Sequence, residues 1–305
     1  MVVRYTVLEG DCRMVKTGFM ERNLRVIFPL PAVVFVVVMM VFPVLYTLAL
    51  SFTNWNLTSG MPISFVGLRS YIRVFSEPRF IAAIGRTFAF TGMAMTLETI
   101  LGLAIALVLN REFLGKGLVK LFLLLPLVAT PVAVGIVFNL FFDPTIGLAN
   151  WALTMVGLPK SEWVSNAATV LPSLVLVDVW QWTPMITLIC LAGLASLPAD
   201  PFESARVDGA SSPQIFMFIT LPMLAPTILT AMILRLIDAL KTFDIIFAMT
   251  GGGPGYASET LNILGFKYSF EYFKMGQASV MLVSLFIIVL ASSLGIMKMR
   301  ARSEG

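Results

Sequence analysis

Six apolar stretches run through the chain, and no other feature of the sequence restricts its fold so strongly. A transmembrane helix needs about 20 residues to cross a hydrocarbon core of about 30 Å, because each residue advances it by about 1.5 Å. All six stretches reach that length. The sequence therefore predicts an all-α integral membrane protein with six transmembrane helices. The predicted spans are Val26–Phe52, Phe88–Leu109, Leu118–Phe142, Thr169–Leu194, Leu224–Met249 and Gln277–Met297.

The composition agrees with this class of protein. Hydrophobic residues make up 58% of the 305 residues and charged residues only 12%, whereas soluble domains carry about 25% charged residues. The net charge of +4 does not indicate nucleic acid as a partner, because the basic residues are spread along the chain. The first span is too long for the apolar core of a signal peptide, and we expect it to be retained.

The distribution of Lys and Arg predicts the orientation. With both termini in the cytoplasm, twelve of the 21 basic residues fall in inner segments and seven in outer ones, as the positive-inside rule expects. The predicted parts are a cytoplasmic tail (1–25), one transmembrane domain (26–297) and a short cytoplasmic tail (298–305). The outer segment 53–87 is rich in aromatic residues, so we expect it to be partly structured. Five or seven spans would invert the later loops.

The longest patterned loop, residues 197–226, follows the fourth span on the predicted inner side. Asp200 is a candidate N-cap, with Pro201 at the first helical position and Glu203 placed as in a capping box. Gly209 can end that helix in a left-handed conformation, and Ser212 begins a second start signal. The loop is therefore predicted to form a helix, a glycine corner and a second helix.

This loop resembles the EAA loop of permease subunits of binding-protein-dependent ABC importers. The positions that would couple to the ATPase are Glu203, Ser204, Ala205, Asp208, Gly209, Ala210, Leu221 and Pro222, and Phe216 and Ile219 also match the family pattern. The family most often has alanine where Ser204 stands. The resemblance implies a cytoplasmic coupling helix that docks on an ATPase subunit. The alternative is an amphipathic loop that covers its own helix ends.

The resemblance also implies partners and a location. They are a second permease subunit, two ATPase subunits that carry ATP and Mg, an extracytoplasmic substrate-binding protein and the lipid bilayer of a bacterial cell membrane.

A glycine-rich turn, Thr250 to Gly255, follows the fifth span, and within it Gly251, Gly252, Gly253 and Pro254 resemble the TGGGP signature of carbohydrate-type importer permeases. Glycines allow close approach of a partner to the backbone. No Lys-Ser or Lys-Thr follows, so the turn is not a phosphate-binding loop. The alternative is a turn that only ends the helix.

Polar side chains within the spans mark a candidate substrate pathway, because such groups are costly in a bilayer. The fourth span holds Asp178, Gln181 and Trp182, and the fifth holds Arg235 and Asp238. At about 1.5 Å per residue, counted from the outer ends of their spans, Asp178 and Asp238 lie at similar depths of roughly 13 and 16 Å. Carboxylates, amides, arginine and aromatic rings are also the groups that bind sugars.

Alignment with maltose-importer permeases implies substrate contact for Asp178, Trp182 and Arg235, with Asp238 and Ala239 at neighbouring positions. In the alternative interpretation, Arg235, Asp238 and Lys241 neutralise one another or pair with a sister subunit.

Missing motifs exclude several other functions. The chain has no histidine, so it has no Ser-His or Cys-His catalysis and no histidine-ligated metal site. It also lacks the GxxxxGK[ST] motif, so ATP hydrolysis must occur on a partner. The sequence thus predicts a non-catalytic permease subunit of an ATP-driven importer of a di- or oligosaccharide, with trehalose as the narrowest hypothesis. The alternatives are a permease for a non-sugar solute and an ATPase-independent channel.

Overall fold

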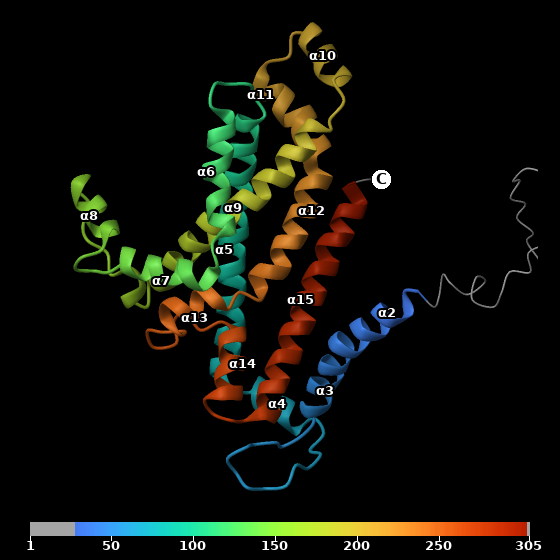
Figure 1. Ribbon diagram of the computed structural model, residues 1–305, viewed down its shortest axis with the longest axis vertical. Helices are drawn as coiled ribbons and strands as arrows, with labels where there is room; N and C mark the ends of the chain where they lie inside the picture. Colours follow the sequence, from blue (N-terminus) through green and yellow to red (C-terminus); the bar gives the residue numbers. More distant parts are fainter. Residues whose placement is uncertain (1–27, 304–305) are drawn as a thin grey trace, which may run out of the picture. The chain divides into compact units, whose positions relative to one another are not determined.

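The computed structural model describes residues 28–303, and within that range the chain is helical apart from its connecting segments (Figure 1). The only β-type pairing in this range is an isolated bridge between Thr53 and Phe65. Five helices are long and apolar enough to cross a membrane, or six if one bent pair counts as a span. The predicted all-α membrane fold is therefore confirmed. The predicted tail 1–25 lies outside the described residues.

The chain divides into two compact units, residues 1–49 and 50–305. The described part of the first unit is one nearly continuous helical stretch made of α2 (Leu30–Val36), η1 (Val37–Val41) and α3 (Phe42–Leu50). Hydrophobic side chains cover all of its faces, as expected of a helix surrounded by lipid. It agrees with the predicted first span, since the apolar helix runs over Leu30–Ser51.

Four long helices form the body of the second unit. They are α5 (Pro78–Leu109), α9 (Val170–Ala195), α12 (Leu221–Leu240) and α15 (Met275–Ser303). Helix α5 packs along α9, and α12 contacts α5, α9 and α15. Helix α15 continues past the predicted end of the last span at Met297 and ends at Ser303.

Glycines allow these helices to approach closely. A Cβ atom at Gly102 of α5 would lie 2.9 Å from the Ile186 side chain of α9, and one at Gly193 of α9 would lie 2.7 Å from Thr227 of α12. Both distances are too short for real contacts. Small residues at helix crossings are typical of membrane proteins, where van der Waals packing drives helix association.

The third predicted span, Leu118–Phe142, is not one straight helix. It is broken into α6 (Lys116–Val128) and α7 (Pro131–Phe141), which meet at an angle of 100°. The break has a local cause, because Thr130 precedes Pro131 and adopts an extended conformation, as residues before proline prefer.

The fifth predicted span, Leu224–Met249, is also wrong at its end. Helix α12 stops at Leu240, and a separate helix α13 (Asp244–Thr250) follows. The interrupting segment contains Lys241, which is half exposed, and polar residues of this kind are unfavourable in the middle of an apolar helix. The second halves of both broken spans, α7 and α13, pack against each other.

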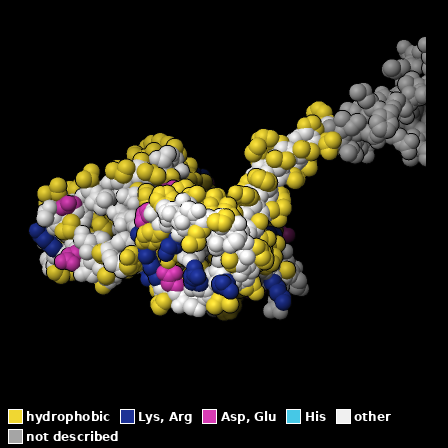
Figure 2. All heavy atoms as spheres, turned by 90° about the horizontal axis from the view of Figure 1, so that it is seen from below, with side chains coloured by type: hydrophobic (Ala, Val, Ile, Leu, Met, Phe, Trp, Pro, Cys, Tyr) yellow, Lys and Arg dark blue, Asp and Glu magenta, His cyan; other side chains and the backbone are white. Residues whose placement is uncertain are grey.

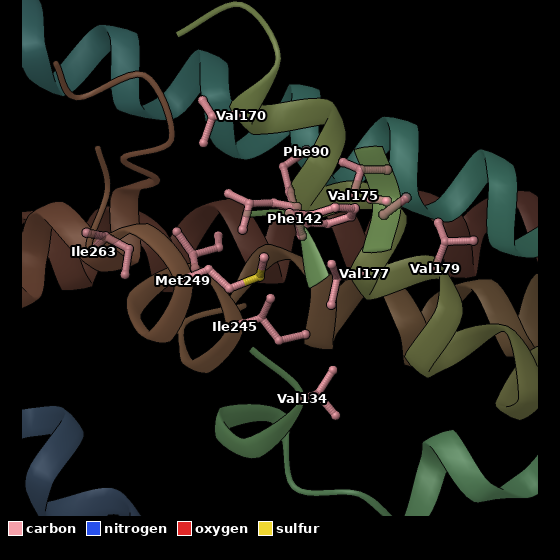
Figure 3. Close-up of a cluster of buried hydrophobic side chains, with 14 residues drawn as sticks. Phe90, Val134, Phe142, Val170, Val175, Val177, Val179, Ile245, Met249 and Ile263 are labelled. Atoms are coloured by element: carbon pink, nitrogen blue, oxygen red, sulfur yellow. The ribbon is translucent and has the colours of Figure 1, made fainter. Parts of the chain in front are cut away.

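A buried apolar cluster joins these broken spans to the long helices (Figure 3). Phe90 of α5, Phe142 at the end of α7 and Val175 of α9 lie close together in it, and Ile245 of α13 packs against the same group. The breaks are therefore held by packing and not only by local sequence.

The connecting elements lie toward the ends of the second unit (Figure 1). Helices α10 (Asp200–Val207) and α11 (Ser212–Ile215) lie at one end, followed by η3 (Phe216–Thr220). Helices α4 (Arg69–Phe75) and α14 (Leu261–Phe270) lie at the other. We call these the α10 end and the α14 end. Helix α8 (Leu148–Met155) lies at the side of the unit instead, beyond α7 (Figure 1). The short η2 (Trp163–Ser165) follows it before α9. Helix α4 and the start of α5, which begins at Pro78 and not at the predicted Phe88, lie within the predicted outer segment 53–87 and give it structure.

Candidate functional site

The patterned loop forms the helix, glycine corner and helix that the sequence predicts. Gly209 has φ = +79° and lies between α10 and α11, in the left-handed region that favours glycine. Two details of the capping differ from the prediction. Asp200 lies inside the first turn of α10 without capping it, because the N-cap is Ala199. The second start is one residue earlier, where Ser211 and Gln214 form a capping box.

Most of the residues predicted for coupling are accessible at the α10 end. Glu203, Ser204, Asp208, Gly209 and Pro222 are exposed, whereas Ala205, Ala210 and Leu221 are half-buried. A cavity of about 730 Å³ lies between these helices and the adjoining ends of α5 and α9. Phe202, Glu203 and Arg206 of α10 line it together with α11 residues. The arrangement presents a polar helix and a hollow beside it, which is a geometry that can receive part of another protein.

Three charged side chains meet inside the second unit, one from each of α5, α9 and α12. We call Glu98, Asp178 and Arg235 the buried triad, since each side chain is at most 1% exposed. The Arg235 guanidinium donates from Nε to Glu98 Oε2 at 2.6 Å and from Nη2 to Glu98 Oε1 at 3.1 Å. It also donates to Asp178 Oδ2. This bidentate geometry joins three helices that are far apart in the sequence.

The surroundings of the buried triad are only partly polar. The Arg235 guanidinium carbon lies 5.2 Å from the centre of the Trp182 ring. Asp178 Oδ1 is buried and has no hydrogen-bond partner in the described part of the chain. One turn along α9, Gln181 donates from Nε2 to the Ala129 carbonyl at 2.9 Å, which ties α9 to the break between α6 and α7.

The remaining candidates of the substrate pathway lie apart from the buried triad. Asp238 pairs with Lys241 at 3.5 Å, and both side chains are about half exposed. Ala239 is buried. The structure thus brings Asp178, Arg235 and Trp182 together and leaves Asp238 out.

Sequence reasoning missed Glu98. A signal was available, because Glu98 is an acidic residue within the otherwise apolar span Phe88–Leu109 and therefore needs a partner.

The glycine-rich turn lies at the α14 end and is fixed by a second group of charges. Gly252 has φ = +91°, and a Cβ there would lie 3.2 Å from the Glu259 side chain, so the turn needs glycine for both conformation and space. Glu259 is fully buried and binds three cations, which we call with it the Glu259 cluster. They are Arg79 at 2.6 Å, Lys267 at 3.3 Å and Arg86 at 4.0 Å.

This second group was not predicted from the sequence. Arg86 also donates from Nε to the Glu259 carbonyl at 2.7 Å, so α5 binds both the side chain and the backbone of the loop. The Tyr256 ring stacks 3.8 Å from the Arg79 guanidinium carbon. The loop after the glycine turn is therefore anchored to α5 and α14.

Comparison with known proteins identifies the family of this chain and a solved structure with the same fold. Residues 98–302 match the family described as binding-protein-dependent transport system inner membrane component. The chain is 36% identical over 283 residues to the trehalose/maltose transport system permease protein MalF of Thermococcus litoralis, which covers 93% of this chain and 95% of that one. It is 33% identical over 266 residues to the trehalose transport system permease protein SugA of Mycobacterium tuberculosis, covering 87% and 85%.

A solved structure has the same fold. It is a chain of a bacterial alginate ABC transporter in complex with an alginate-bound periplasmic protein, with a TM-score of 0.79 and 20% identity, covering 93% of this chain and 96% of that one.

Proposed function

Because the chain belongs to the family of binding-protein-dependent transport system inner membrane components, we propose that it is a permease subunit of an ATP-driven sugar importer and forms half of its translocation pathway. Similarity to permeases named for trehalose and maltose along most of the chain supports a di- or oligosaccharide as the substrate. Trehalose is the narrowest form of the proposal.

The observation that carries the coupling part of the proposal is the exposed corner between α10 and α11. Its turn depends on Gly209, and its polar residues Glu203 and Asp208 face outward. In the proposed mechanism this corner seats on an ATPase subunit that holds ATP and Mg, and closure of two such subunits moves α9 and α12. A second permease subunit completes the pathway, and an extracytoplasmic binding protein delivers the sugar at the α14 end. Both termini then lie in the cytoplasm of a bacterial cell.

For the pathway itself we propose Asp178, Gln181, Trp182, Arg235, Asp238 and Ala239, with two different roles. Asp178 and Arg235 are bound to each other and to Glu98, so they position α5, α9 and α12, and sugar reaches them only if these helices separate. Asp238 is half exposed, so its carboxylate can accept sugar hydroxyls directly.

The proposal is tested at Gly209. A valine there is forced into a left-handed conformation that β-branched residues avoid, although no atom lies within 4 Å of the added Cβ. We expect Gly209→Val to lower uptake of labelled trehalose or maltose at least tenfold and to leave membrane insertion unchanged.

Gly157 provides a matched control. It follows α8, has φ = +76° and likewise has nothing within 4 Å of a Cβ, so Gly157→Val applies the same backbone strain away from the corner. Wild-type uptake in Gly209→Val, or an equal loss in both variants, would reject the coupling role.

A further inference from the structure

A polar cavity of about 550 Å³ lies at the α14 end, away from the buried triad and the α10–α11 corner. Its walls come from the outer segment after α3, from α4 and from the turn between α14 and α15. Hydrogen bonds hold these walls together. The Gly276 amide donates to the Trp55 carbonyl at 2.9 Å, and the Leu57 amide donates to the Phe273 carbonyl at 3.0 Å. The cavity is therefore part of the fold.

The lining of the cavity carries an excess of positive charge. Arg69 and Arg73 are one turn apart on α4 and share a face, and Lys274 faces the same space. Glu77 is the one acidic residue in the lining, and its carboxylate accepts a hydrogen bond from the Tyr268 hydroxyl at 2.5 Å. Burial and this contact raise the pKa of Tyr268 above its usual range. Within residues 28–303, none of the three cations forms an ion pair.

The cations of the Glu259 cluster differ in this respect. They lie at the same end of the molecule but share one buried carboxylate, so their charge is partly satisfied within the fold. Figure 2, which views the molecule from this end, shows basic side chains gathered on its surface with acidic ones among them. Unlike these cations, the three cations of the cavity have no carboxylate partner among the described residues and are available to an anion.

Large apolar side chains flank the cavity-lining residues along the outer segment and α4. Met61, Ile63, Phe65, Leu68 and Ile72 are each between 55% and 78% exposed. Helix α4 therefore carries arginines toward the cavity and apolar side chains toward the outside, as helices do that lie in a membrane surface. Trp55 lines the cavity, and tryptophan is typical of the membrane–water interface. A small soluble anion would make no contact with these apolar side chains, whereas acyl chains would.

We infer that this cavity is a binding site for the headgroup of an anionic phospholipid. The phosphate binds between Arg69, Arg73 and Lys274, and the acyl chains lie against the exposed apolar residues of the outer segment and α4. The site requires no sugar and no partner subunit, so it goes beyond the proposed transport function.

Native mass spectrometry of the full-length chain in neutral detergent tests the site. The protein is titrated with dioleoyl phosphatidylglycerol and with dioleoyl phosphatidylcholine, which share their acyl chains. We expect tighter binding of phosphatidylglycerol to the wild-type chain. Arg73→Gln lowers that affinity about fivefold and the Arg69→Gln/Arg73→Gln double variant about 25-fold, since each basic residue near an anionic lipid contributes about 1 kcal/mol.

Two controls separate charge from folding and location. The Arg69→Lys/Arg73→Lys variant keeps both charges and retains most of the affinity. Arg111→Gln removes an exposed arginine near the α10 end and leaves the wild-type affinity unchanged. Both arginines of α4 are exposed, so the variants elute and melt as the wild type does.

Two results would overturn the inference. One is an unchanged preference for phosphatidylglycerol in the double glutamine variant. The other is full displacement of the lipid by millimolar glycerol 3-phosphate, which would assign the cavity to a soluble phosphate instead.

Discussion

The buried triad and the Glu259 cluster both pair buried charged side chains with partners of opposite charge, but their compositions are opposite. In the buried triad two carboxylates surround one guanidinium, and all three side chains are at most 1% exposed. In the Glu259 cluster three cations surround one carboxylate, and the cations are between 13% and 20% exposed while the carboxylate is buried. Both groups join helix α5 to segments far away in the sequence.

The difference shows which member of each group controls its stability. Inside the helix bundle, loss of the shared partner leaves like charges that water cannot reach, and breaking a buried pair in this way is strongly destabilising. At the α14 end the cations reach solvent, so loss of the shared carboxylate is less severe. The buried triad therefore holds the body of the fold, and the Glu259 cluster holds the loop after the glycine turn.

Removal of the shared arginine is expected to have the largest effect. Arg235→Met keeps an apolar chain of similar length but leaves Glu98 and Asp178 facing each other without a cation. We expect a loss of about 3–5 kcal/mol in the free energy of unfolding and a correspondingly lower melting temperature. Thermal melting followed by intrinsic fluorescence measures it.

Two variants separate charge imbalance from lost packing. Arg111→Met makes the same chemical change at an exposed arginine and should melt like the wild type. Adding Glu98→Gln and Asp178→Asn to Arg235→Met removes the unpaired charges and should restore part of the stability. If Arg235→Met melts at the wild-type temperature, the buried triad does not hold the helices.

Removal of the shared carboxylate is expected to have an intermediate effect. Glu259→Gln preserves the shape of the side chain but weakens its contacts with Arg79, whose Nε and Nη2 atoms donate at 2.8 and 2.6 Å. We expect a loss of about 2 kcal/mol, the usual size for hydrogen bonds to charged groups. The loop 250–260 should exchange its amide hydrogens faster while the bundle stays protected, as hydrogen–deuterium exchange would measure.

An exposed ion pair of similar length provides the control for this variant. Glu112 lies 2.8 Å from Lys116, but its side chain is 89% exposed. Glu112→Gln should therefore leave the stability close to that of the wild type. Equal exchange of loop 250–260 in Glu259→Gln and in the wild type would mean that backbone contacts alone hold the loop.

The sequence predicted the class of fold well because a membrane span is recognised from the summed hydropathy of its residues, wherever along the chain they lie. About 20 apolar residues predict a helix wherever they occur, and α5, α9 and α15 lie where such stretches are. The breaks at Thr130 and Lys241 were missed because both lie in stretches of high mean hydropathy. Each break depends on one local conformation and on the packing of α7 against α13, which no window average records.

The candidate site was predictable only where its signal is local. The turn at Gly209 follows from a glycine between two helix start signals, and the structure contains it. The partner of Arg235 was not predictable in this way. The alternative interpretation paired Arg235 with Asp238 and Lys241 of its own span or with a sister subunit, whereas its partners in the structure, Glu98 and Asp178, come from two other helices. Such pairings depend on how helices cross, and a single sequence does not contain that information.

The exposed pair Asp238 and Lys241 is expected to have the smallest effect on stability, and it sharpens the contrast with the buried triad. The two groups lie 3.5 Å apart with about half of each side chain exposed, and such pairs contribute about 0–1 kcal/mol. Asp238→Ala should therefore melt within about 1 kcal/mol of the wild type. If Asp238 binds sugar hydroxyls, the same variant should reduce uptake of labelled trehalose or maltose by about tenfold or more, because a lost hydrogen bond to a charged acceptor is worth about 1.5–3 kcal/mol. Glu112→Ala breaks an exposed pair elsewhere and should leave both stability and uptake unchanged, so a decrease in uptake confined to Asp238→Ala identifies a contact with the transported sugar. Wild-type uptake in Asp238→Ala would instead make it a surface ion pair and remove Asp238 from the pathway.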